Sequence, residues 1–144
     1  CKLMARQLII RDKFDSAHML VGYNGPCRNI HGHTWRVEVV FTASGNELDD
    51  IGIVVDFKIL KSLLKEITGY LDHKLLIKKC PETEELIRFL SKYTKIVELE
   101  NNPTAEYLSS YIKDALNKKL IQMDLPIVVT EVRVWESENA CAVY

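Results

Sequence analysis

Apolar and polar residues alternate most clearly in TWRVEVVFTA, residues 34–43. Four large apolar side chains share one face of the strand that this alternation predicts: Trp35, Val37, Val39 and Phe41. The earlier segment RQLIIRDKF, residues 6–14, has an apolar centre rich in β-forming residues and predicts a preceding strand. We therefore expect residues 6–43 to contain a pair of strands that form a hairpin.

Three later segments show the spacing of helices instead. In DFKILKSLLKEITGYL, residues 56–71, apolar residues recur every three or four positions, and Asp56 is a suitable N-cap. A shorter helical pattern runs from Thr83 to Tyr93. The segment NNPTAEYLSSYIKDALNKKL, residues 101–120, predicts a third helix with Thr104 as its N-cap.

The chain then returns to strand patterns. LPIVVTEVRVWES, residues 125–137, predicts a strand on which Val128, Thr130, Val132 and Val134 share a face with Glu136. ACAVY, residues 140–144, predicts a short final strand. Strands grouped at both ends and helices between them predict an α+β fold: a four-stranded antiparallel sheet with helices packed on one face. The two open edges of such a sheet favour oligomerisation.

Length and charge narrow the class of protein. The 144 residues fit one domain, and we place it at residues 4–144, with Cys1–Leu3 as an upstream remnant before Met4. The net charge of −1 argues against non-specific nucleic-acid binding. We find neither an apolar run of the roughly 18 residues that span a bilayer nor a secretory signal, so we expect a cytoplasmic protein with free thiols and no membrane partner.

The segment CRNIHGH, residues 27–33, carries the first candidate chemistry. His31 and His33 are two residues apart and would share a face of an extended strand. In the predicted hairpin, His18 would lie near the same end. Three neutral imidazoles bind Zn²⁺ and leave its fourth position open, which is typical of a catalytic zinc site. The alternative is that the histidines are ordinary core or capping residues, and spacing alone does not separate the two interpretations.

Three further positions could carry chemistry. Cys27 lies in a loop rich in glycine, and beside a metal it would act as a thiolate base or nucleophile. Asp72 could orient His73 as a proton relay. The alternatives are a buried, inert cysteine and a histidine placed favourably at a helix C-terminus.

Glu136 closes an apolar strand face, where a carboxylate is costly unless it meets donors. A ligand with two adjacent N–H groups, such as the edge of a pterin or guanine, would satisfy it. A strand-end glutamate already in solvent is the alternative. Thr104 and Glu106 open the third predicted helix, where capping residues and acids are normal in any case.

Taken together, six segments resemble one family: the 6-pyruvoyl-tetrahydropterin synthase and 6-carboxy-tetrahydropterin synthase (QueD) family. They occur in the family's order and cover nearly the whole chain. The matching segments are FDSAH (14–18), CRNIHGH (27–33), GIVVDF (52–57), LDH (71–73), NPTAEYL (102–108) and VRVWES (132–137).

The resemblance implies a T-fold that assembles through its sheet edges into a homo-oligomer, either a trimer or a dimer of trimers. It also implies a zinc cofactor, with His18, His31 and His33 as the ligands. The family places residues beside its pterin pocket at the positions of Thr104 and Glu106.

The family's mechanism carries over to four more positions. Cys27 matches the catalytic base, Asp72 and His73 match the proton-relay pair, and Glu136 matches the glutamate that anchors the pterin. The implied substrate is the small molecule 7,8-dihydroneopterin triphosphate, and no nucleic acid takes part.

Two outcomes are known in the family. The carboxy enzyme releases acetaldehyde and triphosphate to give 6-carboxy-5,6,7,8-tetrahydropterin, a precursor of queuosine and archaeosine, whereas the pyruvoyl enzyme keeps the side chain. Three residues separate Cys27 from His31, and this spacing resembles the carboxy enzyme. The chain departs from the family in LDHKLLI, which lacks the usual asparagine, and in its longer segment 77–101. A non-catalytic module that binds zinc or pterin is the alternative from another class.

Overall fold

A curled sheet of six strands forms the frame of the molecule, and the computed structural model describes residues 5–144 of the chain. The predicted remnant Cys1–Leu3 lies outside the described residues. The strand order across the sheet is β4-β3-β1-β2-β5-β6. The strands are β1 (Gln7–His18), β2 (His31–Ala43), β3 (Leu75–Lys78), β4 (Ile96–Leu99), β5 (Ile127–Ser137) and β6 (Ala140–Val143).

The long hairpin of β1 and β2 is the centre of this sheet. Its antiparallel register runs without a break from the Gln7–Thr42 pair to the His18–His31 pair. The predicted apolar face of β2 is confirmed, because Trp35, Val37, Val39 and Phe41 are all buried. The hairpin therefore carries a continuous core face up to the end where the histidines lie.

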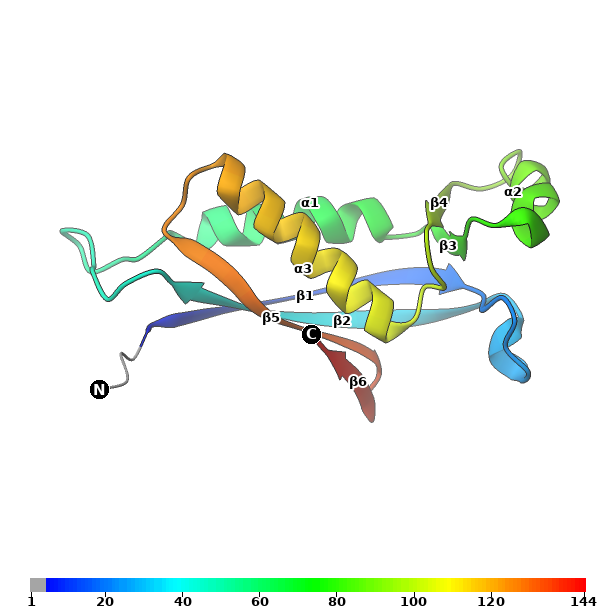
Figure 1. Cartoon of the computed structure of the whole chain (residues 1–144), viewed down its shortest axis with the longest axis horizontal. Coiled ribbons are helices and arrows are strands. Elements are labelled where there is room, and N and C mark those ends of the chain that lie inside the picture. The colour runs from blue at the N-terminus through cyan, green and yellow to red at the C-terminus, as the bar shows by residue number, and fades with distance from the viewer. Residues whose placement is uncertain (1–4) are drawn as a thin grey trace.

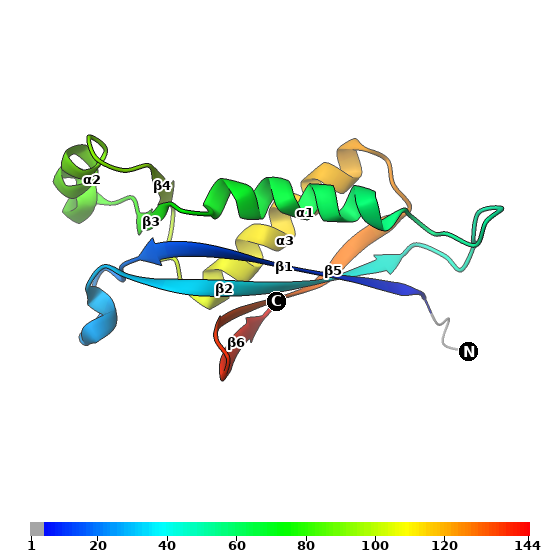
Figure 2. The same cartoon turned by 180° about the vertical axis from the view of Figure 1, so that it is seen from behind.

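The long helices cover one face of the sheet, which confirms the predicted layers (Figures 1 and 2). The helices are α1 (Phe57–Leu71), α2 (Glu84–Leu90) and α3 (Ala105–Gln122), with short 3-10 helices η1 (Pro26–Arg28) and η2 (Pro81–Thr83). Asp56 and Thr104 cap α1 and α3 by accepting hydrogen bonds from the backbone N–H groups of Lys58 and Tyr107. In the described part of the chain, no helix is both long and apolar enough to cross a membrane.

The sheet corrects the prediction of four antiparallel strands. β3 and β4 run parallel to β1 and extend the sheet beyond that edge. The sequence of β3 does not alternate, because Leu75, Leu76 and Ile77 are all buried, as is common in parallel strands. A strand of 4 residues is too short to give a clear periodic signal, so the pattern in the longer segment 77–101 predicts only a helix. The α+β T-fold architecture itself stands.

A bulge in β5 corrects the predicted face of that strand. Val132 and Val134 are buried as expected, but Val128 is 45% exposed and its neighbour Val129 is buried instead. Val40 of β2 pairs with Glu131 and the next residue, Phe41, pairs with Val129. Thr130 is therefore an extra residue, which shifts the alternation of β5 by one position.

Candidate metal centre

Three histidines meet at the end of the β1–β2 hairpin because the register requires it. His18 pairs directly with His31, and His33 pairs with Ser16, one step along the same face. The rings of His18 and His33 also contact the buried Trp35, with centroids 5.0 Å and 5.3 Å from its ring. The sequence prediction that the three imidazoles lie together is confirmed.

Glu136 of β5 joins them from the neighbouring strand. Its Oε1 lies 3.0 Å from Nε2 of His33, and the Nε2 atoms of His18 and His31 are also 3.0 Å apart. One ligand atom from each of the four residues lies within 4.8 Å of the other three. We call these four residues, His18, His31, His33 and Glu136, the histidine cluster.

Backbone carbonyls determine which ring nitrogens can face a metal. Nδ1 of His18 lies 2.7 Å from the carbonyl oxygen of Pro103, and Nδ1 of His31 lies 2.6 Å from that of Asn29. A carbonyl oxygen only accepts, so each Nδ1 carries the proton and each Nε2 presents a lone pair. Two lone pairs 3.0 Å apart repel unless a proton or a cation lies between them.

His33 gives a second sign that the cluster fits a cation. Its Nε2 is buried and makes no hydrogen bond with any group in residues 5–144, although Glu136 Oε1 is close. Buried polar atoms without a partner are rare in folded proteins. Neutral imidazoles and a carboxylate are common zinc ligands, so the donor set suits Zn²⁺.

The environment also favours the neutral form of two rings, those of His18 and His33. Burial lowers the pKa of His18, with a further lowering by His31 and His33, and the hydrogen bond to Pro103 only partly opposes it. Burial likewise lowers the pKa of His33 against the opposing charge of Glu136. Because only a neutral imidazole ligates a metal, these shifts favour metal binding near neutral pH.

Asp72 and His73 form a second group, at the end of α1. His73 Nδ1 lies 2.7 Å from Asp72 Oδ2, so the predicted pairing of these side chains is present. Asp15 holds both residues against β1. Its N–H donates to the side-chain Oδ1 of Asp72, and its carbonyl accepts from the backbone N–H of His73. These bonds hold His73 at a φ of 56°, a left-handed conformation that is uncommon for residues other than glycine.

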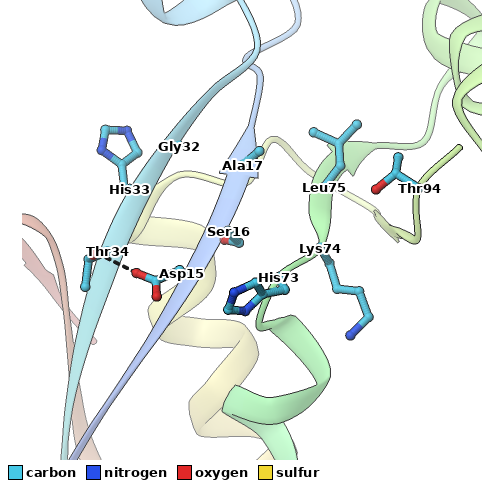
Figure 3. Close-up of a pocket in the computed structure, with 10 residues that line it drawn as sticks. All are labelled: Asp15, Ser16, Ala17, Gly32, His33, Thr34, His73, Lys74, Leu75 and Thr94. Atoms are coloured by element: carbon cyan, nitrogen blue, oxygen red, sulfur yellow. Dashed lines mark hydrogen bonds between the residues drawn. The ribbon is translucent and has the colours of Figure 1, made fainter.

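His73, but not Asp72, lines an open cavity of about 530 Å³ beside β1 (Figure 3). Two hydrogen bonds lower the pKa of Asp72: the one from the Asp15 N–H has the larger effect, and the one from His73 adds to it. The Asp72 carboxylate therefore stays ionised. The His73 ring is 79% exposed. His33 of β2 lines the same cavity as His73, so the histidine cluster and the Asp72–His73 pair border one open space (Figure 3).

The remaining predicted residues lie outside the histidine cluster. Cys27 is a free, half-buried thiol in η1, within the connection from β1 to β2. The hydroxyl oxygen of Thr104 accepts the capping bond from Tyr107, and Glu106 is exposed in the first turn of α3. The structure thus brings four predicted residues together and pairs Asp72 with His73. Among the hydrogen bonds of residues 5–144, none joins Cys27, Thr104 or Glu106 to the side chains of either group.

Sequence reasoning missed the groups that orient these side chains. The carbonyls of Pro103 and Asn29 and the backbone of Asp15 act through the main chain, which no residue pattern reveals. Pro103 and Asp15 do lie inside the segments NPTAEYL and FDSAH, but their side chains gave no reason to single them out.

Comparisons with known proteins point to one family. The chain is 33% identical over 132 residues to 6-carboxy-5,6,7,8-tetrahydropterin synthase of Rickettsia typhi, covering 90% of this chain and 92% of that protein. It is 30% identical over 138 residues to the enzyme of the same name from Haemophilus influenzae, covering 91% and 92%.

A solved structure shares the fold of this chain. The structure of 6-pyruvoyl tetrahydropterin synthase from Plasmodium falciparum superimposes with a TM-score of 0.70 at 20% identity, covering 97% of this chain and 96% of that one. A family model described as 6-pyruvoyl tetrahydropterin synthase matches residues 7–144. Because that match spans the sheet, the helices and the histidine cluster, the chain belongs to the 6-pyruvoyl tetrahydropterin synthase family of lyases.

Proposed function

We propose that this protein is a zinc-dependent 6-carboxy-5,6,7,8-tetrahydropterin synthase acting on 7,8-dihydroneopterin triphosphate. The observation that carries the proposal is the histidine cluster, with one ligand atom from each residue within 4.8 Å of the others and with the Nδ1 atoms of His18 and His31 bonded to backbone carbonyls. The names of the relatives from Rickettsia and Haemophilus, together with the short spacing from Cys27 to His31, favour the carboxy product over the pyruvoyl product.

His18, His31 and His33 would hold the metal through Nε2. A bound Zn²⁺ supplies Lewis-acid stabilisation of the negative charge that develops on substrate oxygen atoms. The protein's own contribution is orientation, since the carbonyls of Pro103 and Asn29 hold two of the rings with Nε2 facing the site.

Cys27 and the Asp72–His73 pair would move the protons. Cys27 as a thiolate removes a proton from the substrate side chain, and His73 returns one at a neighbouring carbon. Asp72 stays ionised and accepts a hydrogen bond from His73 Nδ1, so the opposite nitrogen of that ring is the one that exchanges a proton with substrate.

Glu136 would hold the pterin. Two adjacent N–H groups on the ring edge can donate to its two oxygens, a bidentate geometry that fixes the plane of the ring. Because Glu136 lies 3.0 Å from His33, a ring bound to it places its side chain beside the metal ligands. Thr104 and Glu106 are proposed to border the same pocket.

The reaction balances without an external oxidant. Loss of triphosphate leaves a side chain with two adjacent carbonyl carbons, while the ring gains the two hydrogens that make it tetrahydropterin. Addition of one water across the bond between those carbons gives the 6-carboxylate and acetaldehyde. The pyruvoyl alternative stops before this last step.

A homo-oligomer, either a trimer or a dimer of trimers, completes the proposal. Within the described residues, the edge of β1 over residues 7–14 has no strand partner on the side away from β2. The edge of β5 over residues 127–131 is open in the same way. Two long open edges on one sheet are suited to pairing between copies.

The test is the product formed when zinc-loaded protein is incubated with 7,8-dihydroneopterin triphosphate. We expect a 6-carboxy product by mass and one equivalent of acetaldehyde. A 6-pyruvoyl product would contradict the carboxy assignment and keep the family chemistry. No product with zinc bound would contradict catalysis and favour a binding module.

A further inference from the structure

The side chain of Asn102 forms a two-point clamp on the chain that leaves β1. Its Nδ2 donates to the carbonyl of Val21 at 2.8 Å, and its Oδ1 accepts from the N–H of the same residue at 3.0 Å. Asn102 is half-buried in the connection between β4 and α3, 81 positions away in sequence. One side chain therefore satisfies both backbone groups of Val21, as a neighbouring strand would.

The residue after Asn102 contacts the metal site directly. The carbonyl of Pro103 accepts the hydrogen bond from His18 Nδ1, and Pro103 itself is buried. The connection thus touches β1 and its continuation at two neighbouring points, His18 and Val21. Its own conformation is fixed, because the N–H of Thr104 donates to the carbonyl of Asn102 at 2.8 Å and Thr104 caps α3.

The Asn102 clamp also contacts the loop that contains Cys27, because Val21 belongs to that loop. The N–H of Leu20 donates to the carbonyl of Cys27 at 3.2 Å, which closes the loop over residues 20–27. Val21 is the first residue inside that closure. Asn102 therefore holds the base of the Cys27 loop with its side chain and, through Pro103, presents the carbonyl that orients His18.

We propose that Asn102 is a positioning residue that couples the His18 metal ligand to the Cys27 loop. The inference deepens the proposed function and rests on it for the roles of zinc and Cys27. Removal of the Asn102 amide should therefore loosen both the His18 imidazole and the Cys27 thiol, which lie in different segments of the chain.

The chain supplies a matched control. Asn117 makes the same pair of hydrogen bonds to the backbone of Val129, at 3.1 Å and 2.8 Å, and is also half-buried. It lies near the other end of α3 and joins that helix to β5. Asn117→Ala removes an equivalent clamp far from the histidine cluster, so it reports the purely structural cost.

The experiment compares Asn102→Ala, Asn117→Ala and the wild type, each loaded with zinc. Stopped-flow mixing with a chelator gives the rate of zinc release, and iodoacetamide labelling with peptide mass spectrometry gives the alkylation rate of each cysteine. For Asn102→Ala we expect zinc release about tenfold faster than in the wild type and a changed alkylation rate at Cys27 but not at Cys80. Asn117→Ala should match the wild type in both measurements despite a similar loss of thermal stability.

Equal effects of the two substitutions, or no effect of Asn102→Ala, would overturn the proposal. If Asn102→Ala does not fold, the same measurements are made on Asn102→Asp. This variant keeps the acceptor for the Val21 N–H and loses the donor to the Val21 carbonyl. Wild-type rates in the folded Asn102→Asp variant would also overturn the proposal. Both measurements are independent of turnover. A wild type without lyase activity would refute the proposed function, while the zinc and thiol rates would still decide the role of Asn102.

Discussion

The histidine cluster and the Asp72–His73 pair contain the same kinds of side chain but are built in opposite ways. His18 is 1% exposed, and its neutral form is favoured by burial. The ring of His73 is 79% exposed and sits on a residue with a left-handed backbone. The cluster is positioned by strand register, whereas the pair is positioned by hydrogen bonds from Asp15 to the end of a helix.

The difference indicates separate tasks. A group of imidazoles fixed by strand register, with His18 buried and His31 and His33 half-buried, is suited to holding a metal, which needs fixed geometry and deprotonated ligands. An exposed ring with an ionised carboxylate behind it is suited to proton exchange with a bound molecule. Mutations that separate metal binding from proton transfer test this division directly.

The largest expected effect comes from His31→Ala. Loss of one of three imidazole ligands should reduce the zinc content of the purified protein to near zero and abolish turnover. His73→Ala is the matched control and should keep its zinc. Metal analysis of both variants measures this, and zinc retained by His31→Ala would refute the ligand assignment.

Cys27→Ala should leave zinc bound and slow the reaction by about 10²–10⁴-fold, the range expected for removal of a general base. Cys27 belongs to neither group, so its loss should not alter the fold or the metal. Single-turnover rates with 7,8-dihydroneopterin triphosphate give the effect. A variant that kept the wild-type rate would exclude a thiolate mechanism.

Glu136→Gln tests the role of the one carboxylate in the histidine cluster. Loss of charge-assisted hydrogen bonds to the pterin should raise KM by about 10- to 100-fold with zinc content unchanged. Steady-state kinetics and metal analysis on the same preparation separate the two possible roles. Loss of zinc instead would assign Glu136 as a fourth ligand rather than a pterin anchor.

The smallest expected effect concerns pH and stability at Asp72. Its pKa in the folded protein is lowered below the ordinary value of 3.8, so the ionised group stabilises the fold above that pH. The contribution should disappear as the pH falls from about 4 through the lowered pKa. The difference in free energy of unfolding between the wild type and Asp72→Asn should therefore shrink on acidification. A difference that is constant down to pH 2 would contradict the assignment.

The sequence supported prediction of both the hairpin and the meeting of the three histidines for the same reason. A long strand with clear alternation fixes which side chains share a face, so His31, His33 and Trp35 could be placed together without a structure. The strands β3 and β4 have only 4 residues each, and β3 does not alternate, so neither could be recognised. Contacts through backbone carbonyls, such as that of Pro103 with His18, depend on tertiary packing and leave no trace in residue type.

The extra residue in β5 has a consequence for how this chain tolerates insertions and deletions. Before Thr130 the core-facing positions include Val129, and after it they are Val132 and Val134, with Glu136 continuing the second series. Deletion of Thr130 would leave a regular strand, in which Val129 and the pair Val132 and Val134 can no longer all face the core. If the first half of β5 kept its place in the core, Glu136 would turn to the opposite face of the sheet. Deletion of one residue, about six positions from Glu136, would then take the Glu136 carboxylate out of the histidine cluster although Glu136 itself is unchanged.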